Sequence, residues 1–211
     1  MFFLLVAVIS SFYFYANFPD RVPTHWNFAG EVDAWGSRLS AFIIPVVVIG
    51  VYLLFLALPY LDPKKEKYDQ FKKVYHVFKV IIIAFMVLLY FLTSLNGLGY
   101  NVPIGALMPI IIGVMFVILG NYMSKLKSNW FIGIRTPWTL SSEEVWNKTH
   151  RFGGKMFILG GFLMAIQVFL PLAFRLPIFI LTIALLTVGT FGYSYYIYRQ
   201  EKKKTVLIDK K

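Results

Sequence analysis

The sequence contains no cysteine. This absence excludes a disulfide framework, a thiolate metal site and a cysteine nucleophile. Charged residues are also scarce: they make up 15% of the 211 residues, whereas hydrophobic residues make up 58%. An ordinary soluble domain has about 25% charged and roughly 45–50% apolar residues. The composition therefore predicts an integral membrane protein.

Catalytic signatures are missing as well. The sequence has no G-x-S-x-G, H-E-x-x-H or phosphate-binding glycine loop, and no paired catalytic carboxylates. Inside the apolar runs described below, ionisable side chains are almost absent, since Lys79 lies near an interface and Gln167 is uncharged. Coupled transporters usually need buried charge. These absences favour a binding protein without a catalytic residue, a cofactor or a metal site.

Six apolar runs are each close to the roughly 20 residues that cross a bilayer as a helix. They predict an all-α, polytopic membrane protein with six transmembrane helices. The first run lacks a basic segment before it and a cleavage site after it, which predicts a retained helix rather than a signal peptide. It is also short, so whether residue 1 is the natural start stays open at this point. The runs are Phe2–Phe18, Ala41–Leu61, Val74–Asn96, Ile104–Tyr122, Met156–Phe174 and Pro177–Tyr198.

Basic residues alternate sharply between the connections of these runs. Of the 21 lysines and arginines, 18 fall on one side and three on the other. Because cytoplasmic loops carry the excess of positive charge, this asymmetry predicts that both termini are cytoplasmic. The outer side has Arg21, Arg38 and Arg175, whereas the basic tail 199–211 lies on the inner side.

The first outer loop, residues 19–40, is predicted to be ordered. Two prolines restrict its backbone, and a glycine permits a turn that other residues would resist. One histidine with two nearby acids is a weak metal signal, because no second histidine accompanies it. A structural hydrogen bond or a contact with a partner is the favoured role. The candidate binding residues are Pro23, His25, Trp26, Asn27, Gly30 and Asp33.

The cytoplasmic loop 123–155 is the longest polar passage between the apolar runs. Residues 133–138 predict a tight turn, and Ser141 with Glu144 predicts a capping box that starts a short amphipathic helix on the membrane surface. His150 would lie near the end of that helix, where the helix dipole favours positive charge. The apolar side would carry Val145, Trp146, Thr149 and Phe152, and the polar side Glu143, Asn147, Lys148 and Arg151.

Arg135 presents a guanidinium group beside a proline turn and the aromatic ring of Trp138. A lipid phosphate or a carboxylate of a partner protein would suit this group. So would Glu143 or Glu144 of the same loop. The ion pair within the loop is the simplest of these interpretations.

Two motifs resemble known families. Asn129, Gly133–Leu140, Val145–Trp146, Thr149–Arg151 and Gly154 resemble the SdpI family, whose namesake is the immunity protein against the sporulation-delaying cannibalism toxin of spore-forming bacteria. The spaced residues between positions 19 and 33 resemble a small uncharacterised membrane domain that commonly precedes that module. The resemblance implies a membrane domain at 1–61, a four-helix module at 74–198 that contains loop 123–155, and a basic tail at 199–211.

The resemblance also implies a function, namely protection of the cell against a secreted peptide toxin by binding rather than catalysis. In the namesake, a transcriptional repressor is held at the membrane as well. The outer loop would then face the toxin and the cytoplasmic loop the repressor, with membrane lipids but no nucleic acid as direct partners. The cytoplasmic binding residues would be Asn129, Gly133, Arg135, Thr136, Pro137, Trp138, Glu144, Trp146, His150 and Arg151.

Other classes of function stay open at this point. A membrane enzyme or transporter acting on a lipid or small solute would use His25 and Asp33 outside, or His150 and Glu144 inside. A structural membrane subunit of an envelope-stress system is a further alternative.

Overall fold

The computed structural model describes residues 2–208, and side chains are described up to residue 204. Met1 and the last two lysines of the predicted basic tail, Lys210 and Lys211, lie outside the described residues. The elements are α1 (Phe2–Asn17), β1 (Val22–Trp26), β2 (Val32–Gly36), α2 (Ser40–Leu61), α3 (Tyr68–Gly97), α4 (Ile104–Met123), α5 (Pro137–Ser141), α6 (Glu143–Ile166), α7 (Arg175–Ala184) and α8 (Thr190–Ile208).

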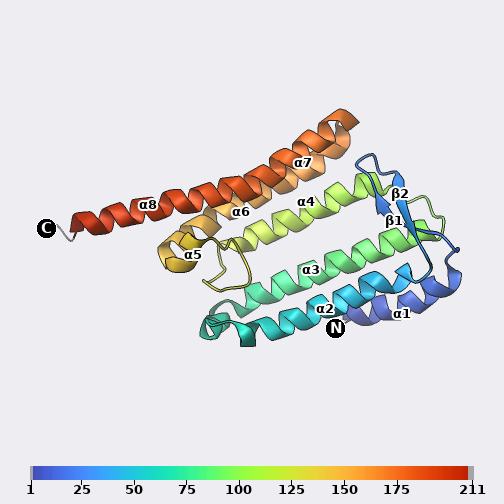
Figure 1. Ribbon diagram of the computed structural model, residues 1–211, viewed down its shortest axis with the longest axis horizontal. Coiled ribbons are helices and arrows are strands. Elements are labelled where there is room, and N and C mark those ends of the chain that lie inside the picture. Colours follow the sequence, from blue (N-terminus) through green and yellow to red (C-terminus); the bar gives the residue numbers. More distant parts are fainter. Residues whose placement is uncertain (1, 209–211) are drawn as a thin grey trace.

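The long helices lie side by side (Figure 1). Helices α1 and α2 pack on α3, α3 packs on α4, α4 packs on α6, and α6 contacts α7 and α8. The two strands lie at one end of this bundle, which we call the hairpin end. Helix α5 and the connection between α2 and α3 lie at the opposite end, which we call the basic end because its loops carry most of the lysines and arginines.

Among residues 2–208, five helical segments are long and apolar enough to cross a membrane. Helix α1 is also apolar but has only 16 residues. The prediction of a largely helical chain with several helices able to span a membrane is therefore confirmed, whereas the count of six spans and the sidedness stay predictions. The five segments are Ser40–Leu61, Lys65–Gly97, Ile104–Met123, Glu143–Phe169 and Leu172–Lys204.

The all-α prediction misses one element. Residues of the outer loop form an antiparallel β-hairpin, in which Val22 pairs with Gly36 and Trp26 with Val32. Valine and tryptophan favour extended backbone, but one proline and one glycine interrupt the alternation expected of strands. An isolated two-stranded hairpin is only marginally stable in water, so its packing on the helices holds it in place.

The predicted surface helix is wrong as a separate element, because α6 runs unbroken from the loop into the membrane segment. Ser142 rather than Ser141 caps it, and the Ser142 hydroxyl accepts a hydrogen bond from the Val145 N–H at 3.3 Å. The predicted apolar side packs on protein instead of lipid. Val145, Trp146 and Thr149 are at most 1% exposed, and the partly buried ring of Phe152 stacks on Tyr193 of α8. The predicted polar side is exposed: Glu143, Asn147, Lys148 and Arg151.

Paired glycines bring α4 and α6 into direct backbone contact. A Cβ atom on Gly113 would lie 2.5 Å from the Gly161 carbonyl oxygen, and one on Gly120 would lie 2.7 Å from the Gly154 carbonyl oxygen. Small residues let membrane helices approach closely enough for such contacts. This contact fixes the first turns of α6 beside the end of α4, where the polar loop begins.

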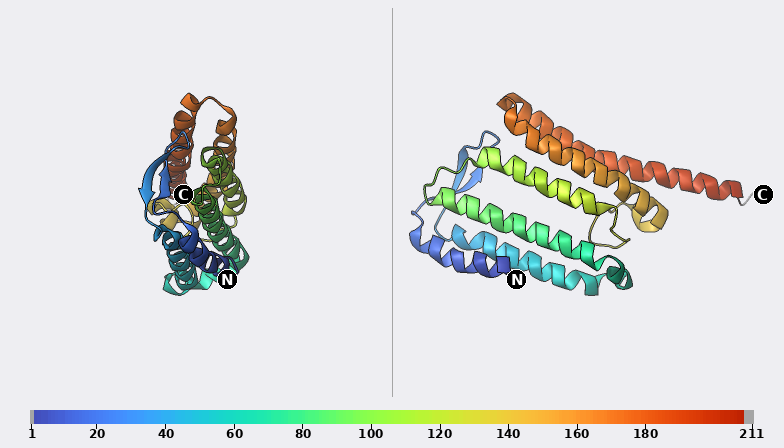
Figure 2. Two further views of the ribbon diagram at one scale, coloured as in Figure 1. Left: turned by 90° about the vertical axis from the view of Figure 1, so that its right-hand side faces the viewer. Right: turned by 180° about the vertical axis from the view of Figure 1, so that it is seen from behind.

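The last membrane segment is longer than its predicted range. A 3-10 turn at Leu172–Phe174 leads into α7, and a π-helical stretch at Leu185–Gly189 joins α7 to α8. Helix α8 extends beyond the other helices at the basic end (Figure 2). It carries the described part of the basic tail away from the bundle.

Candidate functional site

Asn27 closes the turn of the hairpin. Its side-chain oxygen accepts hydrogen bonds from the N–H groups of Ala29 at 2.9 Å and Glu31 at 3.0 Å, and its amide nitrogen donates to the Glu31 carboxylate at 3.1 Å. Gly30 has a φ of +85°, a conformation that favours glycine. Two of the predicted outer binding residues, Asn27 and Gly30, therefore shape the turn itself.

His25 and Asp33 face each other across the hairpin. Nδ1 of His25 lies 2.5 Å from Oδ1 of Asp33, and the two side chains are 68% and 43% exposed. The rings of Phe28 and Trp35 are about half exposed as well. The hairpin thus presents an imidazole, a carboxylate and two aromatic rings to its surroundings. Such a surface is suited to contact with a partner molecule.

The hairpin turn rests on the second half of the chain. Gly30 lies against Gly105 at the start of α4 so closely that a Cβ on either residue would lie 2.8 Å from the Cα of the other. The ring of Phe28 meets the ring of Phe179 in α7, with centroids 5.4 Å apart. A ligand that moves the hairpin would therefore act directly on α4 and α7.

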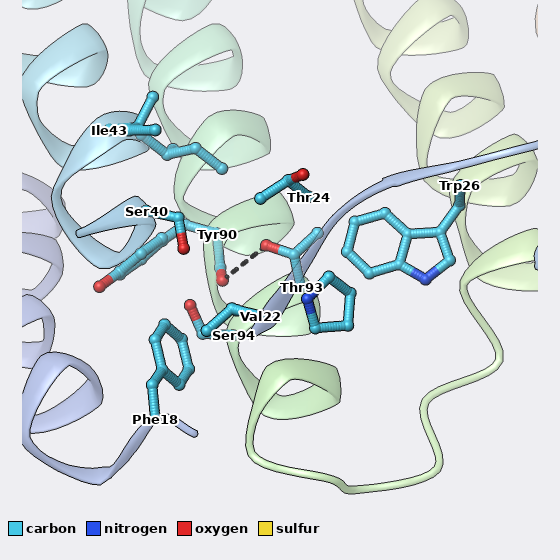
Figure 3. Close-up of a pocket in the computed structure, with 11 residues that line it drawn as sticks. Phe18, Val22, Thr24, Trp26, Ser40, Ile43, Tyr90, Thr93 and Ser94 are labelled. Carbon is cyan, nitrogen blue, oxygen red and sulfur yellow. Dashed lines mark hydrogen bonds between the residues drawn. The ribbon is translucent and has the colours of Figure 1, made fainter. Parts of the chain in front are cut away.

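Cavities flank the hairpin. One of about 110 Å³ lies between β1, α2 and α3, and its wall includes Pro23, Trp26, Ser40 and Thr93 (Figure 3). The Thr93 hydroxyl in this wall donates a hydrogen bond to the Tyr90 carbonyl at 3.1 Å. The cavity is therefore lined by both polar and apolar groups. Another cavity, of about 170 Å³, lies between the hairpin turn, α4 and α7. Two predicted outer residues, Pro23 and Trp26, are thus partly buried and form part of the cavity walls.

At the basic end, Asn129 is fully buried and its hydrogen bonds are made inside the loop. Its side-chain oxygen accepts from the N–H groups of Phe131 at 2.9 Å and Ile132 at 2.7 Å. Its amide nitrogen donates to the carbonyls of Lys127 at 2.9 Å and Ile132 at 3.0 Å. These four bonds use the full capacity of the side chain. Asn129 shapes the loop and has no polar atom left for a ligand.

His150 is buried beneath Gly133. Its Nε2 accepts a hydrogen bond from the Ile134 N–H at 2.9 Å, and its Nδ1 donates to the Trp146 carbonyl at 2.8 Å. One acceptor and one donor match a neutral imidazole. The imidazole stacks on Trp146 at 4.0 Å, and the Trp146 indole N–H donates to the Leu126 carbonyl at 2.9 Å. The prediction that His150 ends a helix as a cation is wrong, because it is enclosed within α6.

Two further loop residues attach the loop to α8. Thr136 caps α5, and its hydroxyl donates to Ser194 at 3.0 Å. The indole of Trp138 packs against the rings of Phe191 and Tyr195, with centroids 4.9 Å away in each case. These contacts fix the position of α8 relative to the loop.

Arg135 is exposed, and its Nη1 donates to the Trp130 carbonyl at 2.9 Å. The predicted ion pair within the loop is wrong, because Glu144 pairs with Lys148 at 2.5 Å and Glu143 pairs with a lysine before α3. Arg135 therefore keeps most of its donors for other partners. The exposed members of the predicted cytoplasmic set are Arg135, Pro137, Glu144 and Arg151.

Asp62 is a site residue that the sequence analysis did not identify. Only 2% of it is exposed, and its carboxylate accepts hydrogen bonds from the Lys64 N–H at 2.8 Å, the Tyr68 hydroxyl at 3.0 Å and the Trp130 N–H at 2.9 Å. The Lys64 ammonium group donates to the Ser128 hydroxyl at 2.7 Å. Asp62 thus ties the end of α2 to the loop before α5. The sequence feature that could have indicated this role is an acidic residue placed directly after the apolar run that ends at Leu61.

The sequence is similar to known proteins. The SdpI/YfhL protein family matches residues 125–196, and a domain of unknown function (DUF1648) matches residues 2–49. The protein "Immunity protein SdpI" of Bacillus subtilis (strain 168) is 31% identical over 198 residues, which cover 92% of each chain. None of the solved structures is significantly similar to this chain. The identity over nearly the whole length shows that the chain belongs to the SdpI/YfhL protein family.

Proposed function

We propose that this protein confers immunity in a bacterial cytoplasmic membrane by binding a secreted peptide toxin at its hairpin end, without covalent chemistry. The observation that carries the proposal is the exposed surface around His25 and Asp33, on a chain whose relative is called an immunity protein. The histidine enclosed at the basic end offers no working group to a substrate, because both of its ring nitrogens are already bonded.

Sidedness is part of this proposal. The hairpin end faces outward and the basic end faces the cytoplasm, because cationic loops are retained inside. The absence of cysteine makes this testable with single cysteines. In intact cells, a membrane-impermeant maleimide should label Ser37→Cys at the hairpin end and spare Ser124→Cys at the basic end. The reverse pattern would reverse the assignment of roles.

We further propose that the basic end relays toxin binding to a cytoplasmic transcriptional repressor. Arg135 and Arg151 are exposed there, and α8 carries further lysines past the bundle. Anionic membrane lipids would bind the same cationic surface. In this division, residues 1–61 receive the toxin, the module 74–198 transmits its presence, and the tail 199–211 holds the surface near the membrane.

The decisive experiment is expression in a toxin-sensitive host, with survival scored against purified sporulation-delaying peptide. Wild type should protect, and His25→Ala should weaken protection at an unchanged membrane level. Arg135→Ala should spare protection and abolish recruitment of the repressor to the membrane. Equal loss of both activities in both variants, at normal membrane levels, would reject the division of labour. No protection by wild type would reject the immunity function.

A further inference from the structure

The cavity of about 170 Å³ lies where the hairpin meets the second half of the chain. The turn residues Asn27 and Phe28 form one wall, and α4, the end of α6 and the start of α7 form the others. Apolar side chains such as Ile112 and Phe179 dominate the lining, and Arg175 is its one charged residue. A mostly apolar cavity with a few placed polar groups is the usual form of a ligand site.

Among the side chains of residues 2–204, none pairs with the charge of Arg175. Its Nε atom is buried without a hydrogen bond, and it joins no ion pair among residues 2–204. The other arginines of the hairpin end are engaged, since Arg38 binds Asp20 at 2.9 Å and Arg21 lies over the Trp35 ring at 5.7 Å. Burying a donor without an acceptor is unfavourable, so an anionic oxygen in the cavity would complement Arg175.

A backbone acceptor without its usual donor belongs to a residue of the cavity wall. Gly105 lines the cavity, and its carbonyl lacks the usual helical donor because residue 109 is proline and has no N–H. A peptide can supply both a carboxylate for Arg175 and a backbone N–H for this carbonyl, whereas an acyl chain supplies neither. The volume suits a single ring or branched side chain, since an apolar cavity of about 150 Å³ holds benzene.

We propose that this cavity binds one large apolar side chain of a peptide whose nearby carboxylate pairs with Arg175. The inference rests on the proposed function, because it assigns the place on the hairpin end where the toxin is recognised. The ligand would touch the domain that carries the hairpin and the module that carries α7 at the same time. Its binding would therefore hold the two parts of the chain together at this end.

The test uses purified full-length protein in phosphatidylcholine nanodiscs and two synthetic probes, acetyl-Leu-Leu-Phe with a free carboxylate and its C-terminal amide. The acid should bind about tenfold more tightly than the amide, because a charge-assisted hydrogen bond is lost in the amide. Arg175→Gln should remove this difference. Arg21→Gln, a matched change at an exposed arginine of the same end, should preserve it.

A second variant covers the case in which Arg175→Gln fails to fold. Met108→Trp keeps the charge and fills the apolar part, so it should weaken both probes equally. Equal affinity of wild type for acid and amide, or no binding of either, would overturn the proposal. So would displacement of the acid by phosphatidylglycerol added to the nanodiscs, which would assign the cavity to a lipid headgroup. Failure of protection with retained probe binding would reject the immunity function and leave the cavity assignment standing.

Discussion

The two ends of the molecule use similar residues in opposite ways. At the hairpin end, His25 and Asp33 bond to each other on an exposed strand pair. At the basic end, His150 and Asn129 are fully buried, and their polar atoms bond to backbone groups of the loop and of α6. A histidine in a polar motif is thus a surface contact at one end and an internal support at the other.

At the basic end, the residues that hold the loop conformation are different from the residues that can contact a partner. The buried residues hold the loop in one conformation, and only a few side chains, such as Arg135 and Arg151, are left to meet a partner. At the hairpin end, shape comes from the turn residues Asn27 and Gly30, and the exposed strands carry the contact groups. Substitution of the buried residues at the basic end should therefore lower mainly stability, whereas substitution of the exposed residues at the hairpin end should lower mainly binding.

The sharpest test compares two tryptophans. Trp146 is 1% exposed, stacks on the imidazole of His150 and donates a hydrogen bond to the Leu126 carbonyl. Trp146→Ala should therefore lower the free energy of unfolding by about 3–5 kcal/mol. Trp35 at the hairpin end is 50% exposed, and Trp35→Ala should cost less than about 1 kcal/mol. The unfolding midpoint in detergent, followed by fluorescence and by size-exclusion profile, measures both. Similar losses would erase the contrast between the ends.

The next test compares two aspartates. Asp62→Ala leaves the Tyr68 hydroxyl and the Trp130 N–H buried without their acceptor, which should cost about 2–4 kcal/mol. Asp33→Ala, the control at the exposed end, removes only a bond to a solvated imidazole. Thermal unfolding of the two variants at equal expression gives the comparison. Asp62→Asn keeps one acceptor oxygen and should fall between Asp62→Ala and wild type.

Much of the fold could be predicted because helix length and apolarity are local properties. The predicted run at 104–122 differs from α4 by a single residue, and the run at 41–61 differs from α2 by one. The continuity of α6 could not be predicted, because Gly153 and Gly154 look like a helix break in isolation. They are retained inside the helix because Gly154 packs directly on the backbone of α4.

The candidate site was harder to predict because burial depends on distant partners. The imidazole of His150 accepts from Ile134, 16 residues earlier, and Asp62 accepts from Trp130, 68 residues later. Polar residues in a loop motif look equally available until these bonds are known. The hairpin was missed for another reason: its strands are short, and their pairing has irregular register near His25.

Two glycines with positive φ allow a smaller test. Gly133 has a φ of +109° and a Cβ there would overlap His150, so Gly133→Ala should cost about 1–3 kcal/mol and lower the unfolding midpoint. Gly30→Ala should instead detach the turn from Gly105 and leave the midpoint nearly unchanged. Maleimide labelling of Ala29→Cys, with and without Gly30→Ala, reports the detachment. An equal drop in both midpoints would show that the hairpin is part of the cooperative core.

The smallest effect on stability is expected for the exposed pair of His25 and Asp33. Surface ion pairs contribute about 0–1 kcal/mol, so His25→Gln should leave the unfolding midpoint within error of wild type. Protection against toxin should still fall, because the exposed imidazole is proposed to contact the toxin and does not stabilise the fold. Combining His25→Gln with Asp33→Asn should lower protection no further than the stronger single variant if the two groups act as one contact. A purely additive loss would mean that the toxin meets them separately, and it would place the contact along the whole strand pair instead of at a single point.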